Sequence, residues 1–296
     1  MHVRRTLPAR ERSLIGAWCF VDHYGPHQVG SGPGMDVPPH PHTGLQTVSW
    51  LFRGEIEHRD SAGVHALVRP GELNLMTAGA GICHSEVSTP ATTVLHGVQL
   101  WVALPDADRD TARDFVHYVP SVHARDGARV RVFLGELAGA RSPAPTFTPL
   151  LGAQVDLGPG ATVAFDVDPG FEHGVLVDTG VVDIADSAEG AATETKPGEL
   201  AYVAPGRHVL RLTAYDEARV MLLGGEPLGE SIVMWWNFVG RTHEEIVAFR
   251  EEWQAQIAEA SDGQDVRPGR FGIVTGEHLP PIPAPALPNA RLKERR

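Results

Sequence analysis

Two short motifs carry side chains that can bind a metal. His40-Pro41-His42 holds two imidazoles two residues apart, and His84-Ser85-Glu86 holds an imidazole and a carboxylate at the same spacing. Side chains at i and i+2 of a β-strand point to the same face of its sheet. If the two motifs lie on neighbouring strands, they present three imidazoles and a carboxylate to one point. That donor set suits a divalent transition metal, and in an octahedron it leaves two positions for water, substrate or O2.

The alternative for each motif is a solvated polar strand face, so the metal interpretation rests on their combination. Gly79 and Gly81, just before His84, allow the backbone to pass close to a site. His58 and Asp60 share a strand face near these motifs, either to orient a metal-bound imidazole or as solvated surface. Cys83 precedes a predicted ligand, so we expect its thiol to point away from the metal into packing.

The elements that must position these motifs are short strands. Gly and Pro number 32 and 24 of 296 residues, which favours many turns and an all-β architecture. From Val37 to Leu104 apolar runs alternate with turn residues, and the second half repeats this pattern. A Pro-Gly-Glu-Leu unit starts at Pro70 and again at Pro197, which indicates a duplication. We expect a linker over 138–148.

The C-terminal part differs from the rest of the chain. Thr242-His243-Glu244-Glu245 is a capping box, and the apolar stripe behind it predicts a helix that ends near Ser261. Leu279 to Pro288 contains five prolines and must be extended. The apolar run Met234-Trp235-Trp236-Asn237-Phe238 is expected to pack in a core or between domains.

Charge and composition exclude several classes of protein. The net charge of −12 lacks the basic footprint of a nucleic-acid-binding protein. No apolar run approaches the roughly 18 residues of a membrane helix, and none near Met1 suits a signal peptide. Cys19 and Cys83 are too few for a disulfide framework, so we expect a cytoplasmic protein.

Longer strings resemble a known family. PHPHTGLQTVSWLFRGEIEHRDSAG, PGELNLMTAGAGICHSE and GGEPLGESIVMWWNFVGRTHEEI are similar to the pirin family of the cupin superfamily, and the resemblance covers nearly the whole chain. It implies a bicupin, two face-to-face β-barrels of jelly-roll type with a C-terminal helix. We expect residues 1–138 to form the barrel with the metal. Residues 139–296 would form the barrel without metal and end in the helix and the Pro-rich strap.

The resemblance also implies a metal site and a reaction. The family's ligands fall on His40, His42, His84 and Glu86, and its usual metal is iron, here Fe(II); Mn, Co, Ni and Cu suit the same ligands. The implied activity is that of a quercetinase, a dioxygenase that opens a flavonol such as quercetin with O2 and releases carbon monoxide. Glu86 is the candidate base for the substrate hydroxyl. The alternative is a regulatory protein whose metal redox state controls binding to a transcription factor or a metabolic enzyme. A monomer is expected.

One position departs from the family pattern, and two histidines of the second half stand without partners. Many pirins have a glutamate where this chain has Gln46, a change that would alter the polarity of the pocket without affecting metal ligation. In the second half, His173 and His208 have no i+2 partner able to ligate. We expect no metal there, and both histidines to lie on the surface or in loops.

Overall fold

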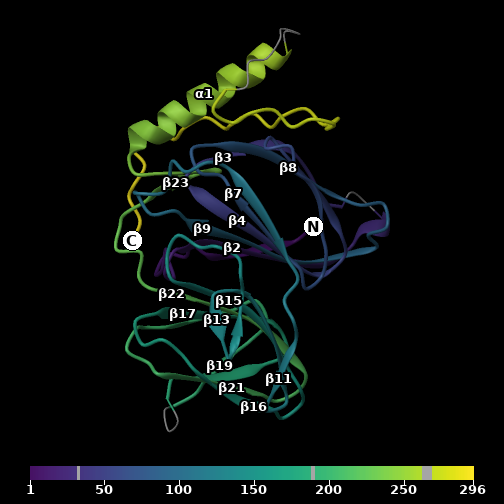
Figure 1. Ribbon diagram of the computed structural model, residues 1–296, viewed down its shortest axis with the longest axis vertical. Helices are drawn as coiled ribbons and strands as arrows, with labels where there is room; N and C mark the ends of the chain where they lie inside the picture. Colours follow the sequence, from purple (N-terminus) through teal and green to yellow (C-terminus); the bar gives the residue numbers. More distant parts are fainter. Residues whose placement is uncertain (32–33, 188–190, 262–268) are drawn as a thin grey trace.

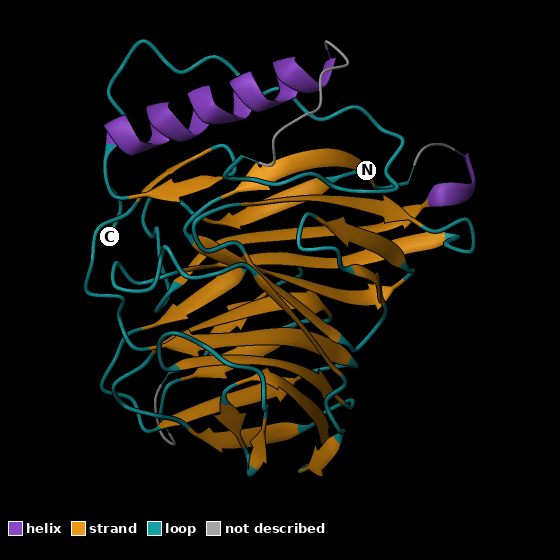
Figure 2. Cartoon of the chain, turned by 45° about the horizontal axis from the view of Figure 1, so that its top comes forward, coloured by secondary structure: helices purple, strands orange, loops and turns teal. Residues whose placement is uncertain are grey.

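Two stacked β-sandwiches and one long helix make up the described part of the chain. The computed structural model describes residues 1–31, 34–187, 191–261 and 269–296. In Figure 1 the first sandwich, in purple and blue, lies between the teal and green second sandwich and the helix. Figure 2 shows the same body of strands with the helix across one end. This arrangement confirms the predicted all-β bicupin fold with its C-terminal helix.

The first sandwich consists of a six-stranded and a four-stranded antiparallel sheet. The six-stranded sheet has the order β1-β2-β9-β4-β7-β10 and comprises Val3–Leu7, Trp18–Gln28, Val94–Ala103, Leu45–Arg53, Leu73–Thr77 and Asp114–Tyr118. The four-stranded sheet has the order β3-β8-β5-β6 and comprises Asp36–His42, Ile82–Ser88, Ile56–Asp60 and His65–Val68. A 3-10 turn, η1, spans Val29–Ser31.

The second sandwich repeats this arrangement. Its six-stranded sheet has the order β11-β12-β15-β22-β17-β20 and comprises His123–Arg125, Ala128–Leu134, Leu150–Leu157, Ala218–Gly225, Glu172–Thr179 and Leu200–Val203. Its four-stranded sheet has the order β16-β21-β18-β19 and comprises Thr162–Asp166, Val209–Ala214, Val182–Ala185 and Thr193–Thr195. The run β2-β9-β4-β7 thus corresponds to β15-β22-β17-β20, and β3-β8-β5-β6 to β16-β21-β18-β19.

The Pro-Gly turns mark equivalent places in the two halves. Gly71 precedes β7 with φ of 75°, and Gly198 precedes β20 with φ of 80°. This left-handed backbone suits glycine, since other residues are strained there. Because β7 and β20 occupy the same place in matching sheets, the turns and the strand order together support the duplication that the sequence indicates.

Both faces of the six-stranded sheet of the first sandwich are covered, which explains why eight of the nine residues of β4 are buried. Its outer face, with Val48 and Trp50, joins one apolar core with Phe133, Leu150 and Met221 of the second sandwich. The Trp50 indole Nε1 donates to Gln154 Oε1 across the interface at 2.8 Å. The inner face faces the four-stranded sheet and carries the residues of the site.

The chain exchanges sandwiches at two places. Strands β11 and β12 already pair in the second sandwich, so the crossing lies at residues 119–122, ahead of the predicted division at residue 138. The expected linker over 138–148 instead contains β14 (Ala140–Arg141), which pairs with β13 (Glu136–Leu137), and Ala140 is buried in the second core.

The closing segment returns to the first sandwich instead of ending on the second. The hairpin of β23 (Val233–Trp235) and β24 (Phe238–Gly240) is followed by α1 (His243–Ser261). Val233, Phe238 and Trp253 share one core with Cys83 of β8, because their large apolar side chains need a surface to bury them. Thr242 Oγ1 accepts the backbone N–H of Glu245 at 3.1 Å, which confirms the predicted cap.

A polar cluster joins the two sandwiches. The Nε2 atoms of His23 and His96, from the first sandwich, lie 2.7 and 2.6 Å from Asp178 Oδ1 in the second. Arg219 Nη1 donates to Asp178 Oδ2 at 3.0 Å. Burial alone would raise the pKa of Asp178, but the hydrogen bonds from the two histidines outweigh it and lower that pKa from 3.8 to about 2.

This cluster predicts a pH-dependent contribution to stability. Asp178→Asn removes a buried charge with three donors, so the free energy of unfolding at pH 7 should fall by about 3 kcal/mol. Because the folded pKa is lowered, the contribution is complete above about pH 4 and is lost as the pH falls toward 2. Urea unfolding should therefore show the two proteins converging in acid. The control is Asp183→Asn, at a half-exposed position, which should change the free energy of unfolding by less than about 0.5 kcal/mol. If the free energies of unfolding of wild type and Asp178→Asn differed by the same amount down to pH 2, the cluster would not be the cause.

Candidate metal centre

Direct pairing of β3 with β8 brings three imidazoles together. The register places His40 opposite His84, and the His40 and His84 ring centroids lie 4.3 Å apart. His42, two residues after His40, lies with its ring centroid 5.0 Å from that of His84. One nitrogen from each of the three rings falls within 4.8 Å of the other two, and all three residues are at most 6% exposed.

Hydrogen bonds fix which nitrogen of His40 and His42 is free. His40 Nδ1 lies 2.9 Å from the Pro38 carbonyl oxygen, and His42 Nδ1 lies 3.1 Å from that of Asn237. A carbonyl oxygen only accepts, so each Nδ1 carries the proton and donates. The Nε2 atom of each ring therefore keeps its lone pair.

A relay orients the third imidazole in the same way. His58 Nε2 lies 3.1 Å from Asp60 Oδ2, and His58 Nδ1 lies 3.4 Å from His84 Nδ1. The Asp60 carboxylate accepts from His58, which leaves His58 Nδ1 to accept from His84 Nδ1. Asp60 is itself held, because its Oδ1 accepts the backbone N–H groups of Ala62 and Val64.

The result is a donor set that fits a cation. His42 Nε2 and His84 Nε2 lie 3.1 Å apart, with a lone pair on each. Two lone pairs at this distance repel one another unless a positive charge lies between them. Metal-bound histidines usually donate their other N–H to a carbonyl or a carboxylate, as these three do directly or through His58. The residues present thus fit a divalent transition metal.

Burial also keeps the imidazoles in the state that binds metal. It lowers the pKa of His40 to about 4 and the pKa values of His42 and His84 well below 6.5. The three rings are therefore neutral at pH 7. A metal would not have to displace a proton from any of the three Nε2 atoms.

Glu86 lies beside this triad. Its carboxylate groups with the rings of His58 and His84 within 4.8 Å, and not in the set that contains His40 and His42. Burial raises the pKa of Glu86, while the nearby His58 and the hydroxyl of Ser49, which donates to Glu86 Oε1 at 2.9 Å, partly oppose that rise. The structure thus gathers three of the four predicted ligands and places the fourth next to His84. Ligation by Glu86 stays a prediction.

The inner face of the six-stranded sheet forms the wall opposite the ligand-bearing strands. The Trp101 ring stands edge-on to His42 with centroids 5.1 Å apart and stacks on Phe20 at 4.0 Å. Among the described residues, the buried Tyr24 hydroxyl has no hydrogen-bond partner. Burial raises the pKa of this phenol, and the charge of Glu86 raises it further. The site thus combines aromatic surface with a polar group that has no partner.

Gln46 does not belong to this wall. Its register places it on the face of β4 that also carries Val48 and Trp50, and its Nε2 donates to Thr77 Oγ1 at 2.9 Å. That face packs against the second sandwich. The expected effect of Gln46 on pocket polarity is therefore wrong, because strand alternation turns its side chain away from the metal centre.

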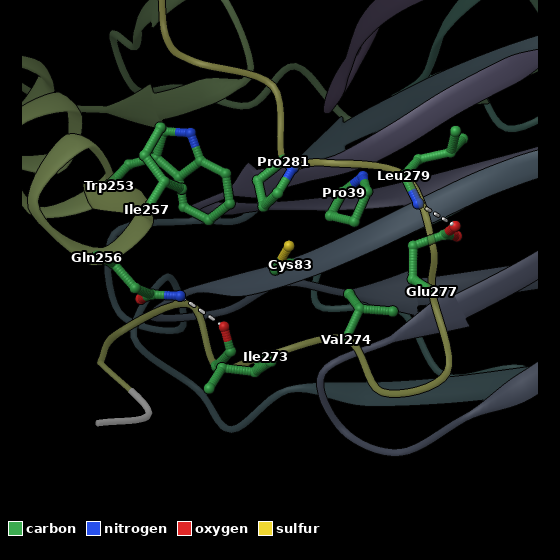
Figure 3. Close-up of a pocket in the computed structure, with 11 residues that line it drawn as sticks. Pro39, Cys83, Trp253, Gln256, Ile257, Ile273, Val274, Glu277, Leu279 and Pro281 are labelled. Carbon is green, nitrogen blue, oxygen red and sulfur yellow. Dashed lines mark hydrogen bonds between the residues drawn. The ribbon is translucent and has the colours of Figure 1, made fainter. Parts of the chain in front are cut away.

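Cys83 points to the opposite side of β8, as predicted. Figure 3 shows it among Trp253, Pro281 and Val274, beneath α1 and the C-terminal strap. These residues line a cavity of about 150 Å³. Burial raises the pKa of its thiol. The cavity therefore lies behind the ligand-bearing strand, and the Cys83 thiol packs among apolar side chains.

The two histidines of the second half lie in different environments. His208 is exposed in a loop, as predicted. His173 is only 1% exposed and lies on β17, so the expectation of a surface or loop position is wrong for it. In the second sandwich, Val163, Phe165, Leu210 and Leu212 of the strands equivalent to β3 and β8 fill the apolar core.

Several contributors to the site were missed in the sequence. Ser49 alternates with Val48 and Trp50, and that polar residue within an apolar strand was an available signal. The Asn237 carbonyl lies 195 residues from His42, and a backbone acceptor leaves no trace in residue types. The run around Phe238 packs in a core as predicted and also orients a ligand.

Comparisons with known proteins agree with this geometry. The family model Pirin matches residues 1–102, and the model of the Pirin C-terminal cupin domain matches residues 152–258. A Pseudomonas aeruginosa protein named "Putative quercetin 2,3-dioxygenase PA1205" is 43% identical over 95% of this chain and 86% of its own. Human Pirin is 31% identical over 82% of this chain and 83% of its own. A crystal structure of quercetin 2,3-dioxygenase from Acinetobacter baumannii superposes with a TM-score of 0.88, with 36% identity, covering 99% of this chain and 93% of that one.

In the described part of the chain, no helix combines the length and the apolar character needed to cross a membrane.

The relay predicts graded losses of metal affinity. His84→Ala removes an Nε2 donor, so Fe(II) bound after dialysis should fall below a tenth of the wild-type amount. Asp60→Asn only loosens the tautomer and orientation of His84, so affinity for Fe(II) should fall about 10- to 100-fold. Competition with a chelating dye measures both.

The control is His208→Ala, which changes an exposed histidine and should keep wild-type affinity. Stoichiometric metal in His84→Ala, or equal affinities of Asp60→Asn and wild type, would show that the ligands or the relay are misplaced.

Proposed function

The chain belongs to the pirin family, and we propose that its first sandwich contains the metal-dependent active site of a dioxygenase that opens a flavonol-like ring. The observation that carries the proposal is the convergence of three neutral imidazoles on one point. The names of two similar proteins add the reaction class, quercetin 2,3-dioxygenase. In that reaction O2 is incorporated and the heterocycle opens with release of carbon monoxide.

The metal we propose is Fe(II), held by His40, His42, His84 and Glu86. When bound, it supplies a Lewis acid that lowers the pKa of the substrate hydroxyl and orients both reactants. The same ligands suit Mn, Co, Ni and Cu. The carbonyls of Pro38 and Asn237 and the His58–Asp60 pair keep the three rings in position before substrate arrives.

Glu86 is the proposed proton acceptor. A flavonol must lose the proton of its 3-hydroxyl, and Glu86 is the carboxylate that groups with His84 inside the site. Ser49 holds Glu86 Oε1, which fixes the direction of the carboxylate. The second oxygen is the one that would bind the metal, and it can take the proton when that bond is open. Burial raises the pKa of Glu86, which strengthens it as a base relative to an exposed carboxylate.

The aromatic wall suits a flat substrate. Trp101 stacks on Phe20 and stands edge-on to His42, which places aromatic side chains beside the metal centre. Such rings favour an aromatic ligand. The Tyr24 hydroxyl, which has no partner among the described residues, is the proposed contact for a substrate hydroxyl. We further propose that the protein acts as a cytoplasmic monomer with no direct nucleic-acid contact.

Carbon monoxide release from quercetin under air tests the reaction and its base together. Protein loaded with Fe(II), and in parallel with Mn(II), Co(II), Ni(II) or Cu(II), should release carbon monoxide. Glu86→Gln should lower the rate per bound metal about 100-fold or more, because the general base is lost. Glu199→Gln, at an exposed glutamate of the second sandwich, should keep the wild-type rate.

Metal content must be measured in every sample. An unchanged rate per bound metal in Glu86→Gln would remove Glu86 from the proton transfer. No release with any metal, in protein shown to hold one, would contradict the dioxygenase and favour the regulatory function, in which the metal controls binding of a protein partner.

A further inference from the structure

His173 is a buried side chain whose polar atoms are unused. It is 1% exposed, and neither Nδ1 nor Nε2 has a hydrogen-bond partner in the described part of the chain. Leaving such groups without partners is unfavourable, and native structures rarely do so. The ring also lies close to the backbone of β22, since a Cβ added at Gly224 would lie 3.0 Å from His173 Cδ2. A buried imidazole without partners indicates a ligand.

The duplication places His173 where the first sandwich has its site. Thr47 pairs with Met76, and His173 pairs with Val203. Met76 and Val203 each lie three residues after the leucine of their Pro-Gly-Glu-Leu unit. His173 therefore occupies the inner-face position equivalent to Thr47, which pairs with the wall residue Trp101.

A cavity of about 360 Å³ opens at this position. Apolar side chains that include Leu137, Leu151, Val167 and Phe171 line it together with His173. The Phe171 and His173 ring centroids lie 6.1 Å apart. A cavity of about 150 Å³ already accepts benzene, so this one has room for a substituted aromatic ring.

Charge at the cavity selects against anions. Asp166, Asp168 and Glu136 line it with the single cation Arg141, which pairs with Glu136 at 3.0 Å. Burial lowers the pKa of His173 to about 4, although the nearby Asp168 opposes this, so the imidazole is neutral at pH 7. It offers one donor and one acceptor, the pair that a hydroxyl complements.

We propose that the second sandwich binds a neutral, substituted phenol, with its ring among the apolar side chains and its hydroxyl on His173. This site is separate from the metal centre and requires no metal. It gives a function to a buried histidine beside Phe171, which packs against the apolar core of the second sandwich.

Calorimetric titration of the metal-loaded protein with 4-methylphenol tests the proposal. Toluene, which has the same shape without the hydroxyl, should bind about tenfold more weakly. 4-Hydroxybenzoate should also bind more weakly, because its carboxylate meets the acidic lining. In wild-type protein, binding of 4-methylphenol should shift the imidazole NMR resonances of His173.

His173→Phe is the decisive variant, since it keeps a ring and removes both nitrogens. Its affinity for 4-methylphenol should fall about tenfold, to that for toluene. Its melting temperature should be equal or higher, because two unpartnered polar atoms leave the core.

The control is His208→Phe, at the exposed loop histidine, which should bind 4-methylphenol like wild type. Carbon monoxide release by His173→Phe should match wild type, so failure here is distinguishable from failure of the proposed function. Equal affinities for 4-methylphenol and toluene in wild type, or 4-methylphenol binding unchanged in His173→Phe, would overturn the proposal.

Discussion

The pairing of β3 with β8 is the constraint on which the rest of the site depends. It sets His40 opposite His84 and turns the side chains of His42 and Glu86 to the same interior. Strand pairing alone would not determine which nitrogen of each ring carries the proton. The carbonyls of Pro38 and Asn237 and the His58–Asp60 pair place the proton on Nδ1, so that each Nε2 lone pair faces the same point. Backbone register thus supplies position, and hydrogen bonds supply the chemical state.

The six-stranded sheet of the first sandwich connects this site to the second. Its inner face carries Ser49 and Trp101, and its outer face carries Trp50 within the core shared by the two sandwiches. The two halves have the same strand order but different interiors. Where β3 presents His40 and His42, the equivalent β16 buries Val163 and Phe165. Duplication has therefore kept the scaffold in both halves, while the imidazoles of the metal centre belong to the first.

Local patterns in the sequence were enough for the strand-rich fold, the capped helix and the i, i+2 motifs, because periodicity and capping are local properties. The family resemblance supplied the two-unit arrangement. Contacts between distant segments could not be predicted in this way: the return of Phe238 and Trp253 to the first sandwich, the Asn237 carbonyl at His42, and the cluster at Asp178. His173 was misplaced because an isolated histidine has no periodic partner, and its burial depends on the register of β17.

Anomalous diffraction at the iron edge from crystals of Fe(II)-loaded protein tests the central claim most directly. We expect one strong peak between the Nε2 atoms of His40, His42 and His84, with the Glu86 carboxylate turned toward it. A second buried group of two histidines and a carboxylate, His23, His96 and Asp178, provides an internal comparison. A peak at that group, or none at the triad in protein that carries stoichiometric iron, would contradict the claim.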